Sequence, residues 1–435
     1  MKETALRVFR ETLAAINIQA ALERKLDCDG KCVHVEGNTI NLADFSEFVA
    51  IALGKAAFPM AEALISVLPS DCSPEGILVA PAPPARGLPR WKTFIGGHPI
   101  PTEASFIAGR AIMERLARCD ERTLIFFLVS GGGSALVEQA LDPSVSQQDF
   151  EKLNQVLVTC GAPIEEINVV RKHFSATKGG RLAAAAPRST KLTLGVSDVP
   201  QGYESALASG PTLPDPTTIA DAQRIVAQYH LLPTLPPSVR EIFEKQLLRE
   251  TPKESDPAFR NAHFSLLLGA HDLLHAAHHA LEGEGIYCIA DNTTDNWPVE
   301  KAADHLLALL ESTKSNDPKK RCAIVANGEV SSPVTGNGVG VGGRNSAFVL
   351  ACAPKIAGKN ITVLSAGTDG IDGNSPAAGA VADGETLARA RAKGLDPLDF
   401  QKRSDAFNFF STLDDAIVIG PTGNNLRDLR ILIAH

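Results

Sequence analysis

The sequence lacks two features that would place it in large classes of protein. No apolar run approaches the roughly 20 residues that a membrane-spanning helix requires, so we expect no membrane association. The formal net charge is -8 and no long basic run is present. A polynucleotide needs a basic face for its phosphates, so this charge balance excludes nucleic acid as the main partner.

Paired cysteines are also missing. The eight cysteines are scattered singly, apart from Cys28 and Cys32 with His34 close by, and no second pair completes a zinc site. Such single cysteines are typical of buried thiols in a reducing compartment. The first 26 residues have the charged and apolar pattern of an amphipathic helix, without the apolar core of a signal peptide. We therefore expect a cytoplasmic protein.

Several well-known catalytic signatures are absent. There is no Walker Gly-Lys-Ser/Thr motif and no Gly-x-Ser-x-Gly motif, which leaves hydrolase chemistry with little support. The glycine loop at 336–343 lacks the acidic residue that a dinucleotide fingerprint requires at the end of a following strand. Four histidines share one predicted helix but lack the Glu of a zinc protease: His271, His275, His278 and His279.

The composition is that of a globular protein, and the order of the predicted strands and helices is that of an α/β fold. Of 435 residues, 44% are hydrophobic and 21% charged, and the length suggests two domains. Proline-rich segments between Pro211 and Asp256 place the boundary near 248–261, giving domains 1–255 and 256–435. Apolar strands alternate with helices, which indicates parallel α/β sheets. The expected strands are 48–53, 77–80, 123–129, 191–197, 286–290, 322–326, 330–334, 361–365 and 416–419, and the main helices are 56–67, 103–118, 147–159, 299–311 and 345–356.

The most informative stretch runs from Thr123 to Leu136. A continuous apolar run, typical of a buried parallel strand, is followed by Ser130, three glycines and Ser134. Glycines between a strand and a helix let the backbone approach an anion closely, so Gly131, Gly132 and Gly133 are candidates to hold a nucleotide phosphate. A tight structural turn is the alternative.

Two further predicted strands end in polar residues. Lys55 follows the strand at 48–53, and Asp198 follows the strand at 191–197. Ligands of open parallel sheets bind beyond the carboxyl ends of the strands. A lysine, a glycine loop and an aspartate at that edge are what phosphoryl transfer needs, since it depends on positioning and charge neutralisation.

A basic segment and two loops supply the remaining candidates. The segment 168–181 contains Asn168, Arg171, Lys172 and Lys178, whose crowding favours an anionic ligand, with a solvated basic face as the alternative. Arg344 begins a predicted helix, where its charge opposes the helix dipole unless it faces an anion. The loop holding Asp369 and Asp372 fails the calcium-loop template at Ile371, so magnesium binding and a structural turn stay equally open.

In combination these motifs resemble one family, the class II glycerate 2-kinases with a MOFRL-type C-terminal domain. The likeness follows the family's order over nearly the whole chain. The matching segments are Gly54–Ala56, Gly97–Pro101, Ser130–Leu136, Asn168–His173, Lys178–Arg181, Ser197–Pro200, Ala208–Pro211, Gly342–Asn345, Ala366–Gly373 and Gly420–Gly423.

The resemblance implies ATP- and Mg²⁺-dependent phosphorylation of D-glycerate on its 2-hydroxyl. It also implies a Rossmann-like N-terminal domain, a smaller α/β MOFRL-type domain, and an active site in the cleft between them. Lys55, Asp198 and Arg344 match the family's catalytic positions. In our hypothesis Asp198 orients or deprotonates the hydroxyl or helps to hold the metal, and Lys55 and Arg344 neutralise phosphoryl and carboxylate charge. Further substrate-side or metal-side candidates are His98, Glu329, Asp369 and Asp372.

Some ligand loops depart from the family pattern. Gln201–Tyr203 replaces an acidic Gly-Asp, Asp291–Trp297 replaces Gly-Glu-Ala-Arg, and Asn327–Val330 replaces Gly-Gly-Glu-Thr. These differences leave open whether the acceptor is D-glycerate or a related hydroxy acid. The oligomeric state is also left open, with a homodimer as the candidate. Two alternatives stand beside the kinase: an NAD(P)H-dependent hydroxypyruvate reductase, and a non-catalytic nucleotide-binding homologue.

Overall fold

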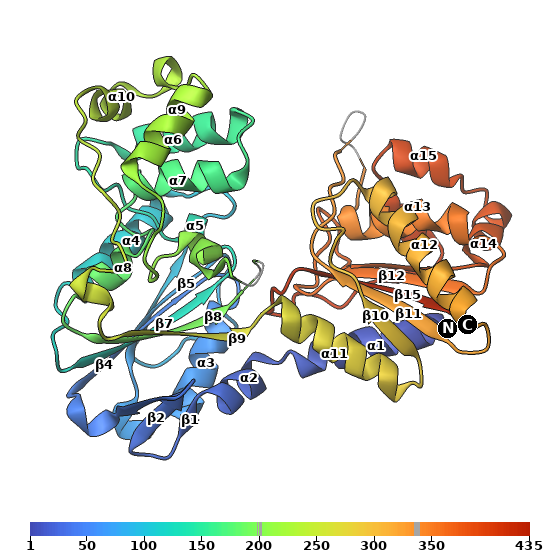
Figure 1. Cartoon of the computed structure of the whole chain (residues 1–435), viewed down its shortest axis with the longest axis horizontal. Helices are drawn as coiled ribbons and strands as arrows, with labels where there is room; N and C mark the ends of the chain where they lie inside the picture. Colours follow the sequence, from blue (N-terminus) through green and yellow to red (C-terminus); the bar gives the residue numbers. More distant parts are fainter. Residues whose placement is uncertain (198, 200–201, 335–339) are drawn as a thin grey trace. The chain divides into compact units, whose positions relative to one another are not determined.

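The computed structural model describes residues 1–197, 199, 202–334 and 340–435. It divides into two compact units (Figure 1), which we call the parallel-sheet unit (Ile18–Leu267) and the mixed-sheet unit (Met1–Asn17 with Leu268–His435). This division differs from domains 1–255 and 256–435. Helix α1 (Lys2–Ala15) packs its apolar face on the mixed sheet, and strand β9 (Ala262–Leu268) lies beside β8 in the parallel-sheet unit.

The parallel-sheet unit is built on a six-stranded sheet in the order β6-β5-β4-β7-β8-β9. Its strands are β4 (Glu47–Leu53), β5 (Glu75–Ala80), β6 (Trp91–Ile95), β7 (Thr123–Ser130) and β8 (Thr190–Val196), followed by β9. The pairs from β6 to β8 are parallel. Every residue of β7 is buried, which confirms the strand predicted there. If these six strands are numbered 1 to 6 by their order in the chain, they lie in the order 3-2-1-4-5-6, which is typical of doubly wound sheets. The switch point is between β4 and β7.

Helices cover this sheet and also form a cluster with its own core. Near the sheet lie α2 (Ile18–Lys25), α3 (Ala57–Val67), α4 (Glu103–Leu116), α5 (Gly133–Leu136) and α8 (Arg181–Ala184). The cluster contains α6 (Gln147–Thr159), α7 (Ile164–Phe174), α9 (Ile219–Gln228) and α10 (Pro237–Glu244), joined by buried side chains such as Phe150 and Val239 (Figure 1). A small antiparallel sheet consists of β1 (Asp27–Cys28), β2 (Cys32–Val35) and β3 (Asn38–Asn41).

The mixed-sheet unit has the strand order β10-β11-β15-β12-β13-β14. Its strands are β10 (Tyr287–Ala290), β11 (Cys322–Asn327), β12 (Ile361–Gly367), β13 (Gly379–Asp383), β14 (Ala416–Ile417) and β15 (Asp428–Ala434). Among the described strands of this unit, β10 and β11 pair in parallel, and β15 lies antiparallel between β11 and β12. Residues 330–334 form an isolated bridge from Ser331 to Pro298 in place of the predicted strand.

Helices lie on both faces of the mixed sheet. Helices α1 and α11 (Ala270–Gly283) cover one face, and α12 (Val299–Asn316) and α13 (Arg344–Ile356) cover the other (Figure 1). Short helices α14 (Thr386–Ala392), α15 (Pro397–Lys402) and α16 (Ala406–Thr412) complete the unit. None of the helices in the described ranges combines the length and apolar content that a membrane span requires.

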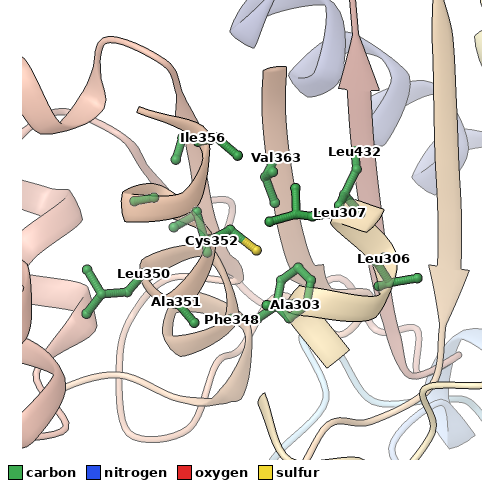
Figure 2. Close-up of a cluster of buried hydrophobic side chains, with 14 of the residues drawn as sticks. Ala303, Leu306, Leu307, Phe348, Leu350, Ala351, Cys352, Ile356, Val363 and Leu432 are labelled. Carbon is green, nitrogen blue, oxygen red and sulfur yellow. The ribbon is translucent and has the colours of Figure 1, made fainter. Parts of the chain in front are cut away.

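The core beneath α12 and α13 fixes the start of α13 at one end of the sheet. Leu306 of α12 and Phe348 and Cys352 of α13 meet Val363 of β12 and Leu432 of β15, and all five are fully buried (Figure 2). Burying a Leu or Phe side chain stabilises the fold by about 1.5–3 kcal/mol. This packing leaves α13 little freedom to shift along the sheet.

Candidate active site

Lys55 and the glycine loop meet at the switch point of the parallel sheet. The amide of Lys55 donates to the carbonyl of Gly131 at 2.9 Å, and the amide of Ala56 donates to Oγ of buried Ser130 at 3.0 Å. Gly54 has φ +119°, and a Cβ there would overlap Ser130. The two strand ends are therefore held together in a way that only glycine at position 54 permits.

Gly132 brings a third loop to this point. It has φ +84°, and a Cβ there would lie 3.2 Å from the imidazole of His98 and 3.4 Å from Cγ of Lys55. Partial burial, together with the charge of Lys55, lowers the pKa of His98 and favours the neutral imidazole. Gly133 then begins α5. The structure thus brings Lys55 and His98 together with three residues of the predicted loop, Ser130, Gly131 and Gly132.

A left-handed turn supports the glycine loop from behind. Ala208, Ser209 and Gly210 have φ values of 50°, 63° and 60°. The Ser209 hydroxyl lies 2.8 Å from the Ser134 hydroxyl, and its carbonyl accepts from the amide of Gly179 at 3.0 Å. Non-glycine residues in this region cost about 1–3 kcal/mol each and are concentrated at functional sites. The turn ties the predicted loop to the basic segment.

The two lysines of that segment are already paired. Nζ of Lys178 donates to Glu138 at 2.5 Å, and Nζ of Lys172 donates to Asp215 at 3.0 Å, with all four side chains at most 8% exposed. Burial lowers the pKa of Lys178, and Glu138 opposes that shift. These placements favour a structural role for both lysines over the predicted phosphate contacts.

The contacts of the other predicted residues in the parallel-sheet unit do not distinguish a ligand-binding role from a structural one. Nε of Arg171 donates to Asn154 at 2.8 Å, and burial lowers the pKa of Arg171. Asn168 lies half-buried on the same helix, α7, one turn earlier. Asp198 lies outside the described residues, directly after buried Ser197.

Arg344 lies in a second cluster, in the mixed-sheet unit. Its Nε donates to Asp428 at 2.5 Å, and Nη1 donates to Glu329 at 2.8 Å. Burial opposes protonation, but the carboxylates of Asp428 and Glu329 outweigh it and raise the pKa of Arg344. Asp428 is buried, whereas the side chains of Arg344 and Glu329 are 37% and 39% exposed. One edge of this guanidinium group is therefore fixed while part of it faces solvent.

The register of β15 explains why Asp428 and Glu329, which are far apart in the sequence, lie at the same edge of the sheet. Asp428 begins β15 opposite Gly367, where β12 ends, and Leu429 lies opposite Asn327, where β11 ends. Because β15 is antiparallel to both neighbours, its start lies at their carboxyl ends. Glu329 follows β11 by two residues, so it reaches the same edge.

The two predicted aspartates of the β12 loop have different surroundings. Asp372 is buried and caps α13: its Oδ1 accepts from the amide of Asn345 at 2.9 Å, and its Oδ2 accepts from the amide of Ser346 at 2.8 Å. Burial raises the pKa of Asp372, and these hydrogen bonds oppose the shift. Asp369 is half-buried and accepts from the amide of Ile371 at 3.1 Å. Asp372 therefore positions the helix that carries Arg344.

Two arginines beneath the cluster hold the loop that carries Glu329. Arg430 is fully buried and donates to the carbonyl of Asn327 at 2.9 Å. Arg427 pairs with Asp295 through two bonds of 2.6 and 2.9 Å, and Asp295 also accepts from the amide of Glu329 at 2.9 Å. The backbone at Glu329 is thus held from both sides.

Asp372, Asp428 and Glu329 already have protein partners, which favours the structural-turn alternative for Asp372. Within the described ranges, no three metal-ligating side chains converge. Both oxygens of Asp372 accept hydrogen bonds from α13, and Asp428 and Glu329 are engaged with Arg344. Asp198, the other metal candidate, lies outside the described residues.

Three important partners were missed from sequence: Glu138, Asp215 and Asp428. Each is an acidic residue whose partner is 40 to 84 positions away in the sequence, so no local pattern indicates the pair. A lone acidic residue in an apolar stretch such as Leu136–Glu138 does indicate a buried cation, although it does not say which one.

Comparison with known families and proteins gives a consistent result. A family model described as a domain of unknown function (DUF4147) matches residues 4–244, and the MOFRL family model matches residues 322–428. The D-glycerate 2-kinase of Thermotoga maritima is 30% identical over 99% of this chain and 98% of its own. The glycerate 2-kinase of Pyrococcus horikoshii is 31% identical over 100% and 97%. A protein of Agrobacterium vitis named putative hydroxypyruvate reductase is 35% identical over 88% and 98%.

Solved structures agree with these relatives. The crystal structure of a glycerate kinase from Thermotoga maritima has a TM-score of 0.86 at 30% identity, covering 100% of this chain and 99% of its own. A structure from Pyrococcus horikoshii has a TM-score of 0.82 at 31% identity, covering 99% and 98%. From the matching family models and full-length relatives, we conclude that the chain belongs to the glycerate 2-kinase family.

Proposed function

We propose that this protein transfers the terminal phosphoryl group of ATP to the 2-hydroxyl of D-glycerate. The observation that carries the proposal is the convergence of Lys55, His98 and Gly132 at the switch point of a doubly wound sheet. Ligands of such sheets bind at this point. Full-length relatives named glycerate 2-kinase support the choice of substrate.

In this proposal Lys55 neutralises charge on the transferring phosphoryl group, and the backbone of Gly131–Gly133 holds nucleotide phosphates. The terminal P–O bond of ATP breaks as a new P–O bond forms to the glycerate oxygen, and the hydroxyl proton passes to a base. We assign that base to Asp198. Phosphoryl transfer relies on such positioning and electrostatic stabilisation.

Arg344 would bind the glycerate carboxylate or a phosphoryl oxygen. Asp428 fixes one edge of its guanidinium group, and the partly exposed Glu329 is the partner with which an incoming anion competes. An arginine held in this way presents its remaining N–H groups in a fixed direction, which suits a planar carboxylate.

The reductase alternative is less well supported by the fold. In a doubly wound domain the turn after the first strand carries the glycine-rich dinucleotide fingerprint. Here that turn, from β4 to α3, contains Gly54 but continues as Lys55-Ala56-Ala57. The sequence therefore offers no backbone approach to a pyrophosphate of the dinucleotide type at this position.

A coupled assay tests the proposal. Purified protein is incubated with ATP, Mg²⁺ and D-glycerate, followed by enolase and pyruvate kinase without a mutase. Since enolase uses 2-phosphoglycerate directly, pyruvate formation supports 2-phosphorylation. Consumption of NADH with hydroxypyruvate would support the reductase instead. ATP binding without turnover across a panel of hydroxy acids would support the non-catalytic homologue.

A further inference from the structure

The imidazole of His98 faces the glycine loop with the edge that carries Nε2. A Cβ at Gly132 would lie 3.2 Å from both Nε2 and Cδ2 of this ring. The side chain of His98 is also exposed, so a ligand can reach it. Among the residues that the structure describes, neither ring nitrogen has a hydrogen-bond partner. Both nitrogens are therefore available to a ligand held at the glycine loop.

Buried Ser105 of α4 closes the short loop that carries His98. Its hydroxyl oxygen accepts from the amide of Gly97 at 2.9 Å and from the amide of Thr102 at 3.1 Å, on either side of His98. The carbonyl of Ser105 accepts from the amide of Glu138 at 3.2 Å, two residues after α5 ends. Ser105 thus fixes this loop to α4 and to the segment that follows the glycine loop.

The residue before this loop packs directly on α5. A Cβ at Gly96 would lie 2.5 Å from the carbonyl oxygen of Leu136, so position 96 has no room for a side chain. The amide of Gly96 donates to the carbonyl of Ala80 at 3.1 Å, which extends the pairing of β5 and β6 by one residue. Contacts with α4, α5 and β5 therefore hold the backbone around His98, as the positioning of a reacting group requires.

The neighbouring Lys55 determines which chemistry His98 can supply. Partial burial and the charge of Lys55 lower the pKa of His98 from its usual 6.5, so the ring is neutral near pH 7. A second positive charge beside Lys55 is unfavourable, which makes His98 a weak general base. A neutral imidazole still has one N–H group, and it can donate a hydrogen bond without adding charge.

We propose that His98 contacts the transferring phosphoryl group and donates a hydrogen bond from Nε2 to one of its oxygens. Ser105 is the positioning residue that places this donor. The role rests on the proposed kinase function, in which Lys55 supplies the charge and His98 adds a directed N–H group. His98 keeps its proton throughout, and the hydroxyl proton passes to the base named above. Because charge spreads over the phosphoryl oxygens in the transition state, a donor fixed beforehand lowers the barrier.

Two substitutions of His98 separate a hydrogen-bond donor from a base. In the coupled assay at saturating ATP and D-glycerate, His98→Ala should lower kcat by about 10²-fold. His98→Gln, which offers a neutral amide donor, should be at least about 10-fold faster than His98→Ala. Glutamine cannot act as a base, so equal losses in both variants would overturn the proposal, as would normal turnover of His98→Ala. A wild-type protein without turnover would instead remove the kinase function on which this role rests.

A double-mutant cycle tests the positioning role of Ser105. Ser105→Ala should lower kcat by about 10-fold in the wild type and change it little in the His98→Ala background, because the two residues act through one contact. The control is Ser189→Ala, which also removes a fully buried hydroxyl, one that donates to the carbonyl of Asp120 at 2.7 Å at the start of β8. It should keep normal kcat. Normal kcat for Ser105→Ala, or losses that multiply with His98→Ala, would overturn the positioning role.

Discussion

Nε of Arg344 donates to Oδ2 of Asp428 across 84 positions of sequence, at a distance of 2.5 Å. The bond joins the first residue of α13 to the first residue of β15. It fixes the direction of the guanidinium group, because Asp428 is itself buried. Any reaction that uses Arg344 therefore depends on Asp428 for geometry.

We expect Arg344→Ala to lower kcat/KM for D-glycerate phosphorylation by at least about 10²-fold, since it removes a preorganised charge. Asp428→Asn should cause a smaller loss, about 10-fold, because the charge stays but its direction is less fixed. Lys355→Ala, in an ion pair near the other end of α13, is the control and should retain normal turnover. Near-normal activity of Arg344→Ala in a folded protein would remove it from the site.

Lys55→Met should also lower kcat/KM by at least about 10²-fold, because methionine keeps most of the length of the side chain but removes its charge. The measurement is the coupled assay, with circular dichroism to confirm folding. If Lys55 and Arg344 serve the same reaction, the double variant should lose less than the product of the two single losses. Independent, multiplicative losses would separate the two residues.

Gly54→Ala should destabilise the parallel-sheet unit more than Gly37→Ala. Both glycines have positive φ, +119° and +81°, but a Cβ would overlap Ser130 at position 54 and meets nothing within 4 Å at position 37. The left-handed conformation costs alanine about 1–2 kcal/mol at either site, and the overlap should add at least about 1 kcal/mol at Gly54. Urea unfolding of the two variants measures the difference; equal losses would mean that the β4 turn adjusts without cost.

Glu138→Gln should destabilise the fold by about 3–5 kcal/mol, because it leaves the ammonium group of Lys178 buried without a carboxylate. Both side chains are at most 3% exposed. The double variant Glu138→Leu with Lys178→Met should be more stable than Glu138→Gln, since it buries no charge. Thermal unfolding checks this order. A double variant that is no better than the single one would show that packing, rather than the unpaired charge, determines the loss.

Acid stability should depend on Glu250. Burial opposes its ionisation, but hydrogen bonds from Lys253 and the amides of Ile219 and Thr251 outweigh it and lower the pKa of Glu250 from 4.5 to about 2. Between these values the unfolded chain binds the proton first, so this stabilisation is complete above pH 4.5 and is lost as the pH falls toward 2. Glu250→Gln should flatten the pH dependence of unfolding in that range. Glu254→Gln, an exposed neighbour, should not.

Local sequence pattern predicted the elements whose residues are uniformly apolar or regularly periodic. The strand at 123–129 and the helix at 147–159 were placed to within one residue of β7 and α6. Strand β15 was missed because Asp428 and Arg430 interrupt its apolar run, although both are buried. Their partners lie elsewhere in the chain, so nothing near them in sequence indicates that a buried strand can hold two charges.

In the candidate site, too, some features follow from local sequence and others depend on contacts between distant segments. Strand ends and a helix start selected Lys55, the glycines and Arg344 as candidates, and their roles in the reaction stay predictions. The pairing of Lys172 and Lys178 with buried acids was not predictable, because a crowded basic segment looks alike whether its partners are ligands or distant carboxylates. The assignment of α1 to the mixed-sheet unit depends on packing between segments more than 250 residues apart, such as α1 and α11.

The central place of β15 in its sheet has a consequence for the order of events during synthesis. The parallel-sheet unit has all its strands once residue 268 has been made, whereas the mixed sheet has no strand between β11 and β12 until residues 428–434 follow. Domains fold as units while the chain emerges. The nascent chain would therefore have Lys55 in place before Arg344 has its partner Asp428. If Arg344 takes part in phosphoryl transfer, that activity would begin only when the last strand has joined the sheet.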